Sequence, residues 1–206
     1  MSSLEFAMPV KTLTHPIRAS SGKYLDLSNF TPDDVNLEDI NASLNYIYRF
    51  TGHHKNRAPL TVAQHTKLTT IICDMVYPNE PDVKFDCLIH DFPEYVTGDV
   101  TTNTKKILGS VFKAYEKHVE QVVYDKLWIR PNPFTEEIYQ KRKVCDLLSL
   151  DIERRSMWDS QTGKDNWPDT PKIIFMNLEA KQALFDEIQA ERFIDLIEMY
   201  NTLGKA

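Results

Sequence analysis

Long apolar runs are missing from this chain of 206 residues. No stretch reaches the ~18 consecutive apolar residues that a membrane-spanning helix needs. The N-terminus also lacks the basic-then-apolar order of a secretory signal. We therefore expect a cytoplasmic protein that has no membrane partner.

Clusters of basic residues are missing as well. The formal net charge is −6, and the lysines and arginines are scattered along the chain. Proteins that bind nucleic acids usually gather their basic residues on one face or in one run. We therefore expect no nucleic-acid partner. A small anionic substrate is compatible with this charge, because a metal ion and a few local cations outweigh a negative surface at short range.

Cysteine is scarce, and the chain has only Cys73, Cys87 and Cys145. The three are odd in number, widely spaced and set among apolar residues, which argues against a disulfide framework or a zinc site. Free cysteine is among the most often buried residue types. The sequence therefore predicts three reduced thiols in the core.

Strand patterns are poor throughout, whereas apolar residues recur at helical spacing in most long segments. Helix-breaking residues separate these segments at 51–59, 78–81, 98–103, 131–133 and 159–171. The predicted apolar stripes are Ile40, Leu44 and Ile47; Leu68, Ile72 and Met75; Ile107, Val111, Tyr115, Val119 and Val122 or Val123; Val144, Leu147 and Leu148, directed inward with Asp146 from a helix that Thr135 opens; and Leu184, Ile188, Phe193 and Ile197.

This pattern predicts an all-α helical bundle. A chain of 206 residues with 42% hydrophobic residues is long enough to bury one sizeable core. We therefore predict one domain over residues 1–206, with its core at about 20–160 and a C-terminal helix at about 177–204.

Four ionisable residues in this helical background point to a metal site. They are His65, the adjacent pair His90 and Asp91, and Asp146. Neighbouring residues on a helix point about 100° apart, so a His-Asp pair needs ligands from other helices to complete a site. Imidazole suits Zn, Fe, Co or Ni, whereas carboxylate and water suit Mg or Mn. Taken singly, each histidine is better explained as an ordinary core or surface side chain.

Local context favours the metal site. Thr61 and Gln64 form a capping-box pattern that opens a helix just before His65. His90 and Asp91 end an apolar run, where ionisable groups are costly to bury without partners. Asp146 lies within a hydrophobic helical stretch and needs a positive partner for the same reason. Pro93 cannot continue a helix without loss of a backbone hydrogen bond, so the helix should end or bend near Phe92.

These residues resemble the H…HD…D signature of the HD-domain phosphohydrolases. The segment His90–Asp99 and Lys105 resemble the active-site region of the bacterial 5'-deoxynucleotidases, as do Tyr48-Arg49-Phe50 upstream. Asp146 followed by Glu153 matches the family's spacing in the last ligand helix. The segment Ser21–Leu27 resembles the start of a phage branch that includes dATP triphosphohydrolases. The resemblance spans roughly residues 20–155.

The resemblance implies an HD-domain helical bundle and a metal-dependent nucleotide phosphohydrolase. His65, His90, Asp91 and Asp146 would hold a divalent ion (Co, Mn, Zn or Mg), and the protein would form a homo-oligomer. We favour release of triphosphate from a deoxynucleoside triphosphate. The alternatives are removal of phosphate from deoxynucleoside monophosphates, a catalytically silent nucleotide-binding protein, and a nuclease, against which the acidic balance of the chain argues.

The remaining candidate residues have ordinary explanations beside their functional ones. Glu94 is a candidate proton acceptor for the attacking water, and Asp99 resembles an aspartate that acts beside the scissile phosphate. A solvated carboxylate and a turn-forming aspartate are the alternatives. Arg49, Lys105 and Arg18 are candidate phosphate contacts, although most such side chains face solvent. Phe50 is a candidate for stacking on a base, although phenylalanine is more often a core residue.

Overall fold

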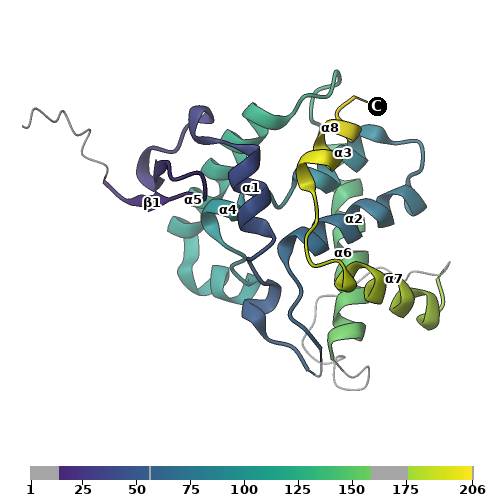
Figure 1. Cartoon of the computed structure of the whole chain (residues 1–206). Helices are drawn as coiled ribbons and strands as arrows, with labels where there is room; N and C mark the ends of the chain where they lie inside the picture. Colours follow the sequence, from purple (N-terminus) through teal and green to yellow (C-terminus); the bar gives the residue numbers. More distant parts are fainter. Residues whose placement is uncertain (1–13, 56, 159–175, 206) are drawn as a thin grey trace, which may run out of the picture.

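Helices make up nearly all of the regular structure in the computed structural model, which describes residues 14–55, 57–158 and 176–205 (Figure 1). The prediction of an all-α fold is confirmed. The helices are α1 (Leu37–Leu44), α2 (Val62–Val76), α3 (Pro81–Ile89), α4 (Glu94–Thr97), α5 (Thr102–Leu127), α6 (Glu136–Met157), α7 (Leu178–Ala190) and α8 (Leu196–Leu203). Single 3-10 turns are η1 (Leu27–Asn29), η2 (Pro32–Asp34) and η3 (Arg49–Gly52). The predicted breaker at 159–171 lies outside the described residues.

A small antiparallel hairpin precedes the helices. It pairs β1 (Pro16–Arg18) with β2 (Tyr24–Asp26), and Ile17 lies opposite Leu25. The sequence pattern did not predict it, because three residues per strand give too little alternation to detect. Gly22 has a φ of +89° in the connecting turn, a conformation that side chains other than glycine rarely adopt.

The helices α2, α3 and α6 pack against one another and position the candidate site (Figure 1). Their starts follow the predicted capping. Thr61 and Gln64 form a complete capping box at α2, and Thr135 caps α6 by accepting from the Ile138 N–H at 3.3 Å. The expected end near Phe92 is also confirmed, because α3 stops at Ile89 and Pro93 is the N-cap of the short helix α4.

The prediction of one helix over about 177–204 is wrong. Two helices, α7 and α8, occupy this segment, and residues 191–195 join them. The Ile194 N–H donates to Asn45 Oδ1 at 2.8 Å, and Asp195 caps α8 by accepting from the Glu198 N–H at 2.9 Å. These bonds replace helical ones, and Phe193, predicted on the apolar stripe, is exposed.

Parts of two other apolar stripes face solvent. The stripe of α5 is buried at Val119 and Val123, but Ile107 is 85% and Val111 81% exposed. Gly109, with a φ of +74°, breaks the helical backbone between these exposed residues. Met75, at the end of α2, is also exposed. The apolar residues of these stripes do recur at helical spacing, but the rest of the protein covers only part of each helix.

The buried apolar residues form two clusters. One brings the hairpin, α1, α5 and α8 against part of α3, with Phe30, Phe85, Phe92 and Tyr200 among its members. The other lies between α2, α3, α6 and α7 and includes Ile72, Ile152, Phe185 and Ile188. None of the helices in the described ranges has the length and apolar character needed to cross a membrane.

Candidate metal centre

His65 lies at the middle of the site. It follows the capping box of α2 and is fully buried. Its Nδ1 is 2.5 Å from Glu153 Oε1, which accepts the ring N–H. This hydrogen bond leaves Nε2 to face two carboxylates, with Asp91 Oδ2 at 3.3 Å and Asp146 Oδ1 at 3.5 Å.

His90 approaches the same point from the end of α3. Its Nδ1 lies 2.9 Å from the Cys87 carbonyl oxygen, so this nitrogen carries the proton and donates it. Its Nε2 is buried without a hydrogen-bond donor or acceptor in the described part of the chain. Asp91 Oδ1 is 3.2 Å from that Nε2, which puts Asp91 between the two imidazoles.

Asp146 completes the cluster from α6. One donor atom each from His65, His90 and Asp146 lies within 4.8 Å of the others. Two further cations contact this carboxylate: Lys143 Nζ is 2.9 Å from Oδ2, and Arg142 Nη1 is 3.9 Å from it. The structure therefore brings the four predicted ligands together from α2, from α6 and from the turn that follows α3.

The donor set fits a bound cation. Each ring donates its Nδ1–H to an oxygen of the protein, so the two Nε2 atoms are the positions that face the carboxylates and can bind a cation or a proton. Burial is the main cause that lowers the pKa of His90 to about 4, so this ring is neutral at pH 7. Burial also lowers the pKa of His65, but Glu153 and Asp146 outweigh it and raise that pKa to about 9. A proton on His65 relieves only its own contacts, whereas a divalent ion relieves those of both rings.

Arg49 and Glu153 support this cluster from behind. Glu153 is fully buried on α6, and Arg49 Nε donates to its Oε2 at 3.1 Å. Arg49 Nη1 also lies 3.7 Å from Asp91 Oδ2. Burial alone would lower the pKa of Arg49, but Glu153, Asp99 and Asp91 raise it. Glu153 thus holds His65 and Arg49 at once, a supporting arrangement typical of metal ligands.

Glu94 and Asp99 lie beside the ligands. Glu94 begins α4, and its Oε2 is buried and has no hydrogen-bond partner within the described ranges. Burial, followed by the charges of Asp91 and Asp99, raises the pKa of Glu94 well above its ordinary value. Burial likewise raises the pKa of Asp99, whose Oδ2 accepts the Phe50 N–H at 3.1 Å. Asp99 therefore does more than form a turn, since it fixes the neighbouring segment.

Phe50 occupies a strained segment at the edge of the site. Phe50 and Thr51 have φ values of 56° and 54°, in the left-handed region that residues other than glycine rarely adopt. The Phe50 ring packs edge-on against Trp158 with centroids 5.0 Å apart, and the Arg49 guanidinium lies over it at 5.3 Å. Such backbone strain is often found at functional sites.

Two predicted phosphate contacts differ in their placement. Lys105, near the start of α5, pairs with Glu116, and its charge acts on both Glu94 and Asp91. Arg18 is exposed in the hairpin, where its guanidinium lies over the Tyr24 ring at 5.8 Å from the centroid. No contact described in the structure joins Arg18 to the metal ligands.

Sequence reasoning missed Arg142, Lys143 and Thr69. Thr69 lies one helical turn after His65, with its Oγ1 3.4 Å from His65 Nε2. Arg142 and Lys143 precede Asp146 on the same face of α6. Each of them lies three or four residues from a ligand on the same helix, and this spacing was the signal in the sequence that could have identified them.

Comparison with protein-family models found no match. Two curated bacterial proteins, both described as uncharacterized, are similar in sequence. Escherichia coli YfdR is 30% identical over 141 residues, which cover 68% of this chain and 71% of YfdR. Rhodobacter capsulatus RCAP_rcc00048 is 28% identical over 137 residues, which cover 66% of this chain and 69% of that protein. On this identity and coverage, the chain belongs to the same protein family as YfdR.

Proposed function

We propose that this protein is a metal-dependent phosphohydrolase of the HD-domain type that acts on nucleotides. The observation that carries the proposal is the convergence of two imidazole Nε2 atoms and two carboxylates from α2, from α6 and from the end of α3. The buried, unpartnered oxygen of Glu94 beside them adds a group for proton transfer. His65, His90, Asp91 and Asp146 would hold the ion. A divalent ion bound there would acidify water and polarise a phosphoryl oxygen.

Glu94 is the proton acceptor in this proposal. Burial, followed by the charges of Asp91 and Asp99, raises the pKa of Glu94, and a cation held by Asp91 would oppose that rise and favour the carboxylate form. It then takes a proton from the water that attacks phosphorus. Asp99 is tied to the Phe50 N–H through Oδ2, which leaves its other oxygen to orient water or protonate the leaving oxygen.

Cations on the same side would bind the anionic substrate. Lys105 acts electrostatically on Glu94 and Asp91, and exchange of its partner Glu116 for a phosphate oxygen would keep its charge paired. Arg49 already binds Glu153 and Asp91, so its first role is to position these carboxylates. Phe50, held in its strained conformation, is the candidate for contact with the base.

We favour deoxynucleoside triphosphates as substrates because the segment Ser21–Leu27 resembles the triphosphohydrolase branch. In the structure, side chains and backbone of this segment connect the hairpin to α1 and η2. Ser21 donates to the buried Asp39 through its N–H at 2.6 Å and its hydroxyl at 2.9 Å, and Lys23 pairs with Asp34 at 3.0 Å. Any effect of the segment on substrate choice is therefore exerted through the placement of these elements.

The test is product analysis. Purified protein is incubated with deoxy- and ribonucleoside mono- and triphosphates and with Mn, Co, Mg or Zn, and chromatography separates phosphate, pyrophosphate and tripolyphosphate. Nucleoside and tripolyphosphate from a triphosphate would identify a triphosphohydrolase, and phosphate from monophosphates a nucleotidase. His90→Ala should abolish turnover and metal binding and keep the helical circular dichroism, whereas His118→Ala, an exposed histidine on α5, should change neither. The absence of turnover with every metal and nucleotide would refute the proposal.

A further inference from the structure

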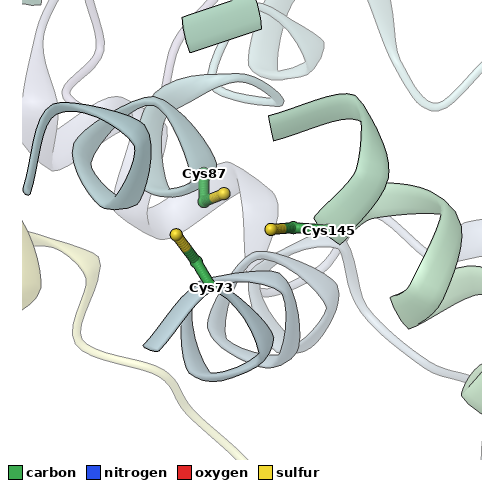
Figure 2. Close-up of side chains that lie close together, drawn as sticks. All are labelled: Cys73, Cys87 and Cys145. Carbon is green, nitrogen blue, oxygen red and sulfur yellow. The ribbon is translucent and has the colours of Figure 1, made fainter. Parts of the chain in front are cut away.

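The chain's three cysteines meet inside the helical core. Cys73 on α2, Cys87 on α3 and Cys145 on α6 are fully buried and unoxidised. Figure 2 shows their side chains directed toward one another, and the three sulfurs lie within 4.8 Å of each other. The predicted reduced core thiols are therefore confirmed, but the wide spacing in the sequence hid their convergence.

The separation of the sulfurs suits three-coordinate binding. Three sulfurs at ~2.3 Å from an ion that they bind in a pyramid, with angles of about 100° between the bonds, would lie ~3.5 Å apart. Small movements of side chains bring sulfurs that are within 4.8 Å to such a spacing. In the described part of the chain this ligand group consists of the three thiols, and the surrounding cluster is apolar, with Leu68, Ile72 and Leu148 among its members.

Charge decides which ion fits best. Structural zinc takes four ligands, and with three thiolates it would leave a net negative charge in an apolar core. Isolated charge is costly in such surroundings. A trivalent ion with three thiolates is neutral and needs no fourth donor. We propose that Cys73, Cys87 and Cys145 form a three-coordinate site for a soft, trivalent, thiophilic ion of the arsenic(III) class.

Binding of arsenous acid is balanced without an oxidant. Three As–O bonds break and three As–S bonds form, and each thiol proton leaves with one hydroxide as water. Arsenic stays trivalent, and a neutral reagent gives a neutral product. The exchange adds one arsenic atom to the chain and removes three hydrogens.

This site is separate from the candidate metal centre but lies on the same helices. The Cys87 carbonyl oxygen accepts from His90 Nδ1 at 2.9 Å, and Cys145 directly precedes Asp146. The two donor sets differ in character, because imidazole and carboxylate suit borderline and hard ions whereas thiolates select soft ones. The same three helices would therefore hold two different ions without exchange between the sites.

Native mass spectrometry tests the proposal. The full-length protein, kept reduced, is incubated with arsenous acid under folding conditions. We expect one bound arsenic per chain, with a mass gain of one arsenic less three hydrogens. Because the chain has only three cysteines, that mass on a monomer requires all of them. An adduct that retains a hydroxyl on arsenic would show binding by two thiols and would overturn the three-coordinate site.

Single Cys→Ala variants supply the controls. Each of Cys73→Ala, Cys87→Ala and Cys145→Ala should lose the fully dehydrated adduct and keep the far-ultraviolet circular dichroism of the wild type. If an alanine variant fails to fold, the wild-type mass still decides. Arsenic uptake by wild-type protein in urea but none by the folded protein would mean that the thiols only pack in the core, and would contradict the proposal.

Discussion

At the scale of single residues, the Glu153 carboxylate links the candidate metal ligand His65 to the candidate substrate contact Arg49. Its two carboxylate oxygens accept from different donors: Oε1 from His65 Nδ1 at 2.5 Å, and Oε2 from Arg49 Nε at 3.1 Å. It touches no candidate substrate contact except Arg49. Its effect on chemistry is therefore exerted through the orientation and basicity of His65 and the position of Arg49.

Replacement of Glu153 by glutamine should weaken metal binding. A glutamine side chain has one carbonyl oxygen, so it accepts from only one of the two buried donors and turns its own N–H₂ toward the other. Loss of such a supporting partner typically costs 10–100-fold in metal affinity. We expect a loss of this size for Mn, measured by competition against a fluorescent chelator.

The matched control is Glu137→Gln on the same helix. Glu137 has a side chain that is 76% exposed, and it pairs with Lys141. Its substitution makes the same chemical change far from any buried donor, so Mn affinity should stay within twofold of wild type. Equal affinities for Glu153→Gln and wild type would show that Glu153 does not orient the ligand.

Some of these residues are readable from the sequence and others are not. His90, Asp91 and Asp146 were identified because ionisable groups in an apolar run need partners, and His65 because a capping box places it near the start of a helix. Arg142 was missed because a basic residue on a helix usually faces solvent. Its partners Asp86 and Asp146 include one on another helix, which only the tertiary structure brings into reach.

At the scale of elements, side chains from α1 and its C-cap bind the segment 191–195 that joins α7 to α8. Asn45 accepts from the Ile194 N–H at 2.8 Å and donates to the Ile194 carbonyl at 2.9 Å, and Asn41 Oδ1 accepts from the Leu196 N–H at 3.0 Å. Two asparagine side chains thus satisfy backbone groups of the buried residues Ile194 and Leu196. Without them these groups would be costly to bury.

Asn45→Ala should destabilise the protein by about 1–3 kcal/mol, the usual cost of leaving a buried polar group unsatisfied. The substitution leaves the Ile194 N–H without its acceptor and removes one of two donors to the Ile194 carbonyl, which the Leu196 N–H also reaches at 3.1 Å. The Ile194 side chain is buried, so water cannot easily replace the lost acceptor. Urea unfolding followed by circular dichroism measures the change in the free energy of unfolding.

Asn201→Ala controls for the loss of an asparagine side chain. Asn201 is exposed on α8, and exposed substitutions usually change stability by less than about 0.5 kcal/mol. If Asn45→Ala proved as mild as Asn201→Ala, the link between α7 and α8 would not depend on α1.

These elements also show where local reasoning succeeds. The starts of α2 and α6 were predicted because Thr61 and Thr135 cap their own helices within three residues. The break between α7 and α8 was missed because Asn45, which replaces the helical hydrogen bonds there, is distant in sequence. A local pattern cannot report a partner of this kind.

At the scale of the whole molecule, α2, α3 and α6 carry both clusters of ligand side chains. The three cysteines lie on these helices, and the candidate metal ligands come from α2, from α6 and from the residues that directly follow α3. An ion bound at either cluster contacts all three helices at once. Ion binding should therefore be linked to global stability, because a site assembled from distant parts of the chain is lost on unfolding.

Manganese should raise the unfolding temperature of the metal-stripped protein. A ligand at 100 times its dissociation constant stabilises the folded state by about 2.7 kcal/mol. For a chain of this length, each kcal/mol shifts the midpoint by roughly 2–4 °C, so the expected gain is about 5–10 °C. Thermal unfolding after chelator treatment, with and without Mn, measures it by circular dichroism.

The cysteines separate the two ion sites in this experiment. Mn prefers nitrogen and oxygen donors to thiolates, so Cys73→Ala should have a lower midpoint without metal but the same gain on addition of Mn. His90→Ala should lose the gain altogether. A gain that disappears in Cys73→Ala and persists in His90→Ala would assign manganese to the sulfur cluster, and would remove the support that the imidazole–carboxylate cluster gives to a phosphohydrolase.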